Sequence, residues 1–165
     1  DLAPAMAAKC PSAAIGGAAV GTVQAAGVTV PIKRFTYPRG GVLNPPATNQ
    51  VVGLSGNHQP LLATSGTTVL AWHVRYGEGC PGTLNPVLSE KVGDTFRITT
   101  ASGRAQEYSI VEKTTVPRGK YRAEWFRNAG PAQVLLLTCA GLKDGKFRET
   151  TAILAEPVTD AASAS

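Results

Sequence analysis

Short apolar stretches separated by turn residues run along most of the chain. Alternating or β-branched stretches predict strands over residues 28–32, 50–54, 67–74, 94–100, 105–115, 133–139 and 147–156. Residues 101–104 and 143–146 are typical of hairpin turns, and aromatic residues at near-helical spacing predict a short helix or turn over 120–128. We therefore expect an all-β fold. The expected architecture is a closed or nearly closed β-barrel of seven to eight short strands with one or two short helices.

The two ends of the chain depart from this pattern. Residues 1–27 are rich in Ala and Gly and almost uncharged, so we expect an irregular N-terminal arm there. The predicted barrel spans 28–158, and the small residues of 159–165 predict a disordered tail. A chain of 165 residues fits one domain. No apolar run approaches the ~20 residues of a membrane-spanning helix, and no signal peptide opens the sequence.

Composition and charge narrow the function classes. Eighteen Gly and twelve Pro residues argue against a helical bundle. Sixteen Lys and Arg against eleven Asp and Glu give a net charge of +5, with the basic residues scattered except for a denser stretch over 113–127. A nucleic-acid binder usually shows a concentrated basic face, so we expect no nucleic-acid partner. An anionic cell wall or membrane surface suits this charge better.

The three cysteines form an odd set, which in an oxidising compartment often means one disulfide and one free thiol. Cys10 and Cys80 lie in loop contexts, whereas Cys139 ends the apolar run 134–138. The working pair is therefore Cys10–Cys80, and three unpaired thiols in a reducing cytosol stay open as the alternative. Neither a Cys-x-x-Cys nor a His-x-x-x-His spacing occurs, so we expect no metal and no cofactor.

Cys139 and His73 are the candidate reactive pair. Each follows an apolar strand, where a side chain at the rim could act as nucleophile or base. The alternative, a buried cysteine and a satisfied core histidine, stays open. Arg148 follows Cys139 by nine residues across the predicted hairpin, so it could lie beside the thiol on the neighbouring strand. A cation there would favour the thiolate and could bind an oxyanion.

These residues resemble the sortase family of cysteine transpeptidases. Residues 135–139, Leu-Leu-Leu-Thr-Cys, are similar to the Thr-Leu-x-Thr-Cys signature, and the strand 69–73 takes the place of the family's Ala-Gly-His strand. The Gly-Asp pair at 93–94 and the Arg-bearing last strand, which ends at Glu156, fit as well. The resemblance covers roughly residues 28–158, and its compact loops are most similar to the actinobacterial type called class F.

The resemblance implies a mechanism and partners. Cys139 would attack the Thr carbonyl of a Leu-Pro-x-Thr-Gly-like sorting signal and form a thioacyl enzyme. His73 would serve as general acid and base, and Arg148 would bind substrate carbonyls or the oxyanion. The partners would be secreted proteins carrying that signal and an amine acceptor such as a peptidoglycan precursor. The family also implies a membrane anchor outside this sequence, which would hold the enzyme, expected to be a monomer, on the extracellular face of the membrane.

Three further residues are implied to line the peptide groove. Thr138 would help to hold the peptide, Trp72 replaces the family's Gly before His73, and Trp125 would contact the Leu-Pro portion. A helical turn that caps the core is the alternative role for the Trp125 segment. Arg75 and Arg127 are the reserve candidates for the catalytic arginine.

Two other functions are alternatives to a sortase-like transpeptidase. A peptidoglycan L,D-transpeptidase is also β-rich and uses Cys and His, but its Arg lies two residues after Cys, where this chain has Gly141. An extracellular β-sandwich that binds or adheres, with structural cysteines only, would show the same strand count.

Overall fold

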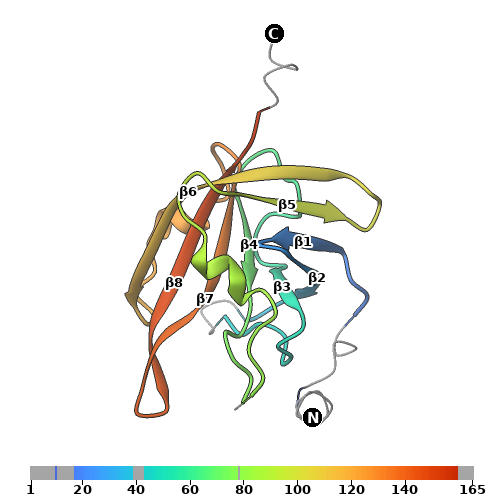
Figure 1. Cartoon of the computed structure of the whole chain (residues 1–165). Helices are drawn as coiled ribbons and strands as arrows, with labels where there is room; N and C mark the ends of the chain where they lie inside the picture. Colours follow the sequence, from blue (N-terminus) through green and yellow to red (C-terminus); the bar gives the residue numbers. More distant parts are fainter. Residues whose placement is uncertain (1–9, 11–16, 39–42, 78, 160–165) are drawn as a thin grey trace.

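Eight strands close into one barrel in the computed structural model, which describes residues 10, 17–38, 43–77 and 79–159 (Figure 1). Around the barrel the order is β1-β2-β3-β4-β7-β8-β6-β5. The strands are β1 (Gly21–Ala25), β2 (Val28–Phe35), β3 (Val52–Ser55), β4 (Thr67–Ala71), β5 (Thr95–Thr100), β6 (Ala105–Pro117), β7 (Gln133–Lys143) and β8 (Lys146–Pro157). The predicted all-β barrel is confirmed.

Two short 3₁₀ helices complete the described part of the chain. They are η1 (Asn85–Ser89) and η2 (Ala123–Phe126), of which η2 falls inside the predicted helix or turn. Neither is long and apolar enough to cross a membrane. The expected tail beyond Thr159 and the first nine residues lie outside the described residues.

The expectation of an irregular arm over 1–27 is wrong for its last part, because β1 is a full member of the barrel. It pairs antiparallel with β2 on one side and with β5 on the other. Val23 and Ala25 are buried, and Ala26 and Gly27, with φ of 49° and 82°, form the two-residue turn into β2. The five residues alternate between buried and more exposed positions, but Val23 is the single large apolar residue among them, so this strand has a weak hydrophobic signal.

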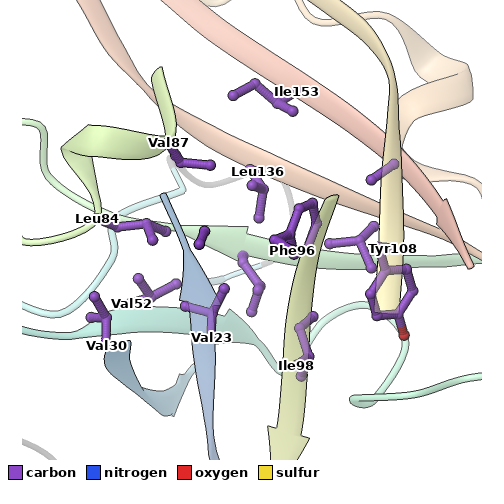
Figure 2. Packing of buried hydrophobic residues seen from close by; sticks show 14 of the residues in the cluster. Val23, Val30, Val52, Leu84, Val87, Phe96, Ile98, Tyr108, Leu136 and Ile153 are labelled. Atoms are coloured by element: carbon purple, nitrogen blue, oxygen red, sulfur yellow. The ribbon is translucent and has the colours of Figure 1, made fainter. Parts of the chain in front are cut away.

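Alternate residues of the strands fill the barrel with an inner core. Val23, Ile98, Leu136 and Ile153 come from four different strands and are completely buried there (Figure 2). Residues that point inward alternate with residues that point outward along each strand, as closure requires. This core keeps the neighbouring strands in a single register, because a slip of one residue would turn each apolar set outward.

A second apolar cluster covers the outside of β4, β7 and β8. Val69, Leu135, Leu137 and Leu154 belong to it, and Trp125 of η2 packs against them. The central strands β4 and β7 are therefore buried on both faces, which explains their nearly continuous apolar sequences. Cys139 follows Leu135 and Leu137 at every second position, so alternation places it on this outer face.

The predicted disulfide is present between Cys10 and Cys80, with 5.5 Å between the Cα atoms. Cys80 lies in the excursion that follows β4, and its carbonyl accepts a hydrogen bond from the Tyr76 N–H. The bridge thus ties the N-terminal region to the loop that leaves the site described next. Disulfides of this kind persist in oxidising compartments.

Candidate active site

The parallel pairing of β4 with β7 brings His73 level with Cys139. Every β4 residue pairs with the residue 66 positions later, from Thr67 with Gln133 to Ala71 with Leu137. The Trp72 N–H extends this ladder by donating to the Leu137 carbonyl at 3.2 Å. His73 and Cys139 are also 66 positions apart, so the register predicts that they lie side by side. His73 lies just past the end of β4, whereas Cys139 lies within β7, which continues to Lys143 and not to 139 as the sequence predicts.

Thr138 of β7 hydrogen-bonds to the segment that follows β4. Its hydroxyl donates to the Trp72 carbonyl at 2.6 Å, and the side chain is buried. A buried hydrogen bond with both partners satisfied resists separation, because opening it would leave a buried carbonyl without a donor. Thr138 lines the cleft as expected, but its hydroxyl is used to hold the peptide unit before His73.

His73 and Cys139 line one cleft of about 240 Å³ on the outer face. Ala71 and Leu137 from the outer cluster lie beside them, and residues 43–45 also line the cleft. Arg118, Tyr121, Phe147 and Thr150 complete much of its lining, and none of the lining residues is Asp or Glu. The cleft is therefore mainly apolar, with one thiol, one imidazole and one guanidinium.

Both reactive groups are neutral at neutral pH. Burial raises the pKa of the Cys139 thiol above its ordinary 9.0, and the Arg118 guanidinium acts in the opposite direction. Burial lowers the pKa of the His73 imidazole below its ordinary 6.5, with the hydrogen bond to Pro45 opposing it. The thiolate and imidazolium needed for nucleophilic attack are thus a minor species of the resting site.

A backbone carbonyl orients the His73 ring. Its Nε2 lies 3.1 Å from the Pro45 oxygen, and because a carbonyl only accepts, Nε2 carries a proton. Nδ1 is then the unprotonated nitrogen of the neutral ring. The Tyr76 ring packs edge-on against the imidazole at 5.7 Å between centroids. These two contacts restrict the ring and leave Nδ1 for proton exchange.

The indole of Trp72, which replaces the family's glycine, packs into the barrel core. It belongs to the inner cluster and donates from Nε1 to the Asn85 Oδ1 at 3.0 Å. Gly82 provides the space: a Cβ there would lie 2.8 Å from Trp72 Cδ1 and 2.5 Å from the His73 carbonyl oxygen. Trp72 is therefore part of the cleft wall, but its indole points into the core and does not narrow the approach to His73.

The complete burial of Trp125 does not fit the direct substrate contact that the resemblance implies. Its ring is 0% exposed in the outer cluster, with the Arg122 guanidinium 5.5 Å from the ring centroid. The core-capping alternative describes this residue better. Tyr121, from the same segment, is 41% exposed and lines the cleft. The segment thus forms one wall of the cleft through Tyr121, and Trp125 supports it from beneath.

The three candidate arginines occupy different positions. In the β7–β8 register Thr150 pairs with Cys139, and Arg148 lies two residues nearer the hairpin, exposed and outside the cleft lining. Arg75 lies over the Phe147 ring at 5.9 Å. The Arg127 carbonyl accepts from the Thr67 N–H at the start of β4, so roughly 20 Å of strand separates it from Cys139.

Arg118 is the cleft residue that sequence reasoning missed. It follows β6, and its N–H donates to the Arg148 carbonyl at 2.9 Å, so the two arginines are cross-strand neighbours. The sequence shows Arg118 only as one of several cations in the basic stretch 113–127. The sequence did contain a signal against Arg148, namely the Asp144–Gly145 turn, whose φ values are 52° and 75°. A two-residue turn there pairs Cys139 with Thr150 and not with Arg148.

A metal site is not formed by the described ranges, since no three His, Cys, Asp or Glu side chains within 10, 17–38, 43–77 and 79–159 are grouped to hold an ion.

Similarity to known proteins lies in the fold. No protein-family model and no curated protein sequence matches the chain. Sortase C1 of Streptococcus agalactiae has a TM-score of 0.67 and 16% identity over 87% of this chain and 69% of that chain. Sortase A of Listeria monocytogenes has a TM-score of 0.63 and 17% identity, covering 87% and 89%. Sortase C of Clostridium perfringens SM101 has a TM-score of 0.62 and 18% identity, covering 87% and 72%.

These matches show that the chain has the sortase fold. The three neighbours are sortases of types A and C, so the resemblance to class F stays a prediction.

Proposed function

We propose that this protein is a sortase-like cysteine transpeptidase. The observation that carries the proposal is the shared cleft: Cys139, the free cysteine of the described residues, and His73 line it on a sortase-type barrel. The parallel register of β4 and β7 and the Thr138–Trp72 hydrogen bond support their positions. The substrate is a peptide with a Leu-Pro-x-Thr-Gly-like signal, cleaved between Thr and Gly.

Two acyl-transfer steps make up the reaction. The Cys139 thiolate adds to the Thr carbonyl carbon, and the tetrahedral intermediate collapses as the C–N bond to Gly breaks. His73 gives its Nδ1 proton to the departing amine, and a thioester with Cys139 remains. An acceptor amine then adds to the thioester and loses a proton to His73. Collapse of the second intermediate forms the new amide and returns the Cys139 thiolate.

Arg118 supplies the positive charge at the developing oxyanion in this proposal. It lines the cleft and acts on the pKa of the Cys139 thiol, so it is near enough for electrostatic stabilisation. The assignment of the same role to Arg148, which the resemblance implies, stays a prediction. Arg148 shares a sheet row with Arg118 and can contact the part of a peptide that extends past the cleft rim.

The apolar lining suits the Leu-Pro portion of the signal. Leu43, Pro45 and Leu137 offer aliphatic surface, and the exposed Tyr121 ring can cover a proline. Trp72 and Thr138 act from behind this surface by holding the strand ends. Trp125 supports the Tyr121 segment and makes no contact with the peptide.

The proposed site of action is the extracellular face of the cell membrane. The Cys10–Cys80 disulfide fits an oxidising compartment, and the net charge of +5 fits an anionic envelope. The partners are secreted proteins that bear the signal and an envelope amine, and the proposed catalyst is a monomer without cofactor.

Neither alternative function is favoured by the structure. A β-sandwich would have two packed sheets, whereas these strands close into one barrel. An L,D-transpeptidase has an arginine two residues after its nucleophile, whereas this chain has Gly141 at that position. Gly141 has φ of 64°, a left-handed conformation in which an arginine would be strained.

A fluorogenic Leu-Pro-x-Thr-Gly peptide tests the proposal with the wild type and Cys139→Ala. We expect cleavage by the wild type only, and a mass increase on Cys139 equal to the acyl fragment when the acceptor amine is omitted. Cleavage that survives Cys139→Ala would refute the assigned nucleophile. A native thiol that does not react with a small alkylating reagent would also contradict it.

A further inference from the structure

A second pocket of about 300 Å³ lies at the opposite end of the β4–β7 strand pair. It is formed where β3 ends at Ser55, by the turn that follows, and by parts of β2 and β5. Gln59 N–H donates to the Thr67 carbonyl and Thr68 Oγ1 donates to the Pro60 carbonyl, so the turn is fastened to the start of β4. Cys139 lies roughly 20 Å further along the sheet. The two sites share no lining residue.

The lining of this second pocket is apolar at its base and cationic at its edge. Val20, Leu54 and Leu61 provide the apolar surface, and all three belong to or pack against the inner core. Arg34 and His58 provide nitrogen donors, with no Asp or Glu in the lining. Among the described residues Arg34 takes part in no ion pair, since the single one there joins Arg122 and Glu112. The pocket thus offers a positive charge that the protein does not neutralise.

The imidazole of His58 is held in place before any ligand arrives. Ser55 is buried, and its Oγ lies 2.8 Å from Nδ1 of His58. The Phe126 ring packs against the imidazole at 5.3 Å between centroids. Nδ1 is therefore engaged, and Nε2 is the nitrogen that a ligand can reach. Preorganised donors of this kind bind without the entropy cost of ordering them.

Two backbone features lie at or next to the same pocket. A Cβ at Gly56 would lie 2.9 Å from Thr36 Cγ2 and 3.3 Å from the Phe35 carbonyl oxygen, so glycine lets the turn pack closely against the end of β2. Leu62 has φ of 58°, a left-handed conformation that a leucine rarely adopts. Leu61 and Leu62 both pack against the inner core, which holds this strained segment in position. Strain retained beside a pocket is a common mark of a functional site.

We propose that this second pocket binds the C-terminal residue of a peptide, its carboxylate on Arg34 and His58 and its apolar side chain on Leu54 and Leu61. The volume equals that of about ten water molecules, which suits one residue with its preceding amide. The Gln59 side-chain amide, at the edge of the pocket, can hydrogen-bond that amide group. This inference is independent of the transpeptidase activity, because it involves none of the cleft residues.

Histidine ring NMR during titration with N-acetyl-leucine tests the proposal. The chain has only two histidines, and His58→Gln identifies the signals of His58. We expect a saturable shift of the His58 signals with a dissociation constant on the order of 1 mM, and no shift of His73. Arg34→Gln should weaken binding about tenfold or more. Arg97→Gln, which removes an equal charge from the exposed face of β5, should leave it unchanged.

Three comparison ligands decide the chemistry. N-acetyl-leucinamide lacks the carboxylate, and equal binding of this amide would overturn the role of Arg34. 4-Methylpentanoate keeps the carboxylate and the apolar arm but lacks the amide, so equal binding would overturn the peptide in favour of an acyl carboxylate. Acetate lacks the apolar arm, and equal binding would reduce the pocket to a simple anion site. Absence of any His58 shift up to high millimolar N-acetyl-leucine would refute the proposal outright.

Discussion

At the scale of the residue, the candidate site combines two groups that burial keeps uncharged. The pKa of the Cys139 thiol is raised and that of the His73 imidazole is lowered, so neither protonation state needed for attack predominates. A neutral resting pair avoids a buried ion pair and its desolvation cost. Only the small fraction of molecules that holds a thiolate and an imidazolium together would react. The groups around the cleft determine how large that fraction is.

The pH dependence of kcat/KM follows from the raised pKa of Cys139 and the lowered pKa of His73. Attack requires a deprotonated Cys139 and a protonated His73. This form is lost as pH falls through the lowered pKa of His73, where both groups are protonated, and as pH rises through the raised pKa of Cys139, where both are deprotonated. Between the two pKa values the reactive fraction is constant. We expect a broad bell whose acid limb lies below pH 6.5 and whose alkaline limb lies above pH 9.0. A narrow optimum with both limbs between these values would contradict the neutral resting pair.

Arg118 and Arg148 can be separated by matched variants. Arg118→Ala should lower kcat/KM on the order of 100-fold, the effect of losing one oxyanion donor. It should also move the alkaline limb of the profile to higher pH, because the guanidinium lowers the Cys139 pKa. Arg97→Ala removes an exposed arginine of β5 and serves as the charge control.

The pH profile of kcat/KM for Arg148→Ala tests whether Arg148 is the catalytic arginine instead. A 100-fold loss with Arg148→Ala and a minor loss with Arg118→Ala would return the catalytic role to Arg148. An alkaline limb that stays in place in Arg118→Ala would mean that Arg118 does not act on the thiol.

At the scale of the element, the pairing of β4 with β7 decides the geometry of the site. The two strands run parallel, and β4 ends at Ala71 whereas β7 continues past Cys139 to Lys143. Hydrogen bonds from the Trp72 N–H and the Thr138 hydroxyl continue the pairing beyond the last residue of β4. The loop after His73 then folds back, with Gly82 N–H donating to the Val74 carbonyl at 2.9 Å. The position of His73 therefore depends on this loop as well as on β4.

Gly82→Ala tests that dependence. The added Cβ would lie 2.5 Å from the His73 carbonyl oxygen, so the backbone of the loop or of His73 must move. We expect a loss of about 1–3 kcal/mol in the free energy of unfolding, together with a fall in kcat/KM. Gly17→Ala is the matched control, because nothing lies within 4 Å of its added Cβ. Full activity in Gly82→Ala would show that the loop does not position His73.

At the scale of the whole molecule, closure of the barrel and one disulfide hold the site together. Strands from all parts of the described chain contribute to the inner core, and the reactive groups lie on its outside. The disulfide joins residues 70 positions apart, and neither cysteine lines the cleft. Its expected contribution is to stability, by restricting the unfolded chain.

The double variant Cys10→Ser/Cys80→Ser removes the bridge without leaving an unpaired thiol from it. We expect a loss of about 2–4 kcal/mol in the free energy of unfolding, with turnover of the folded protein largely intact. A thermal melt and the peptide assay measure the two effects. Reductant should destabilise the wild type and not the variant. If turnover disappeared while the protein stayed folded, the disulfide-bonded loop would belong to the catalytic machinery.

The sequence by itself determined the strand-rich barrel, the Cys10–Cys80 pair and the candidates Cys139 and His73. Hydrophobic alternation, turn residues and loop contexts are local signals, and each was strong for these features. It missed β1, which alternates but has Val23 as its single large apolar residue. Tertiary structure alone decided which side chains meet: Trp125 is buried, Trp72 fills space left by Gly82, and Arg118 reaches the cleft. Contacts between distant segments depend on strand register and packing, which no single stretch of sequence encodes.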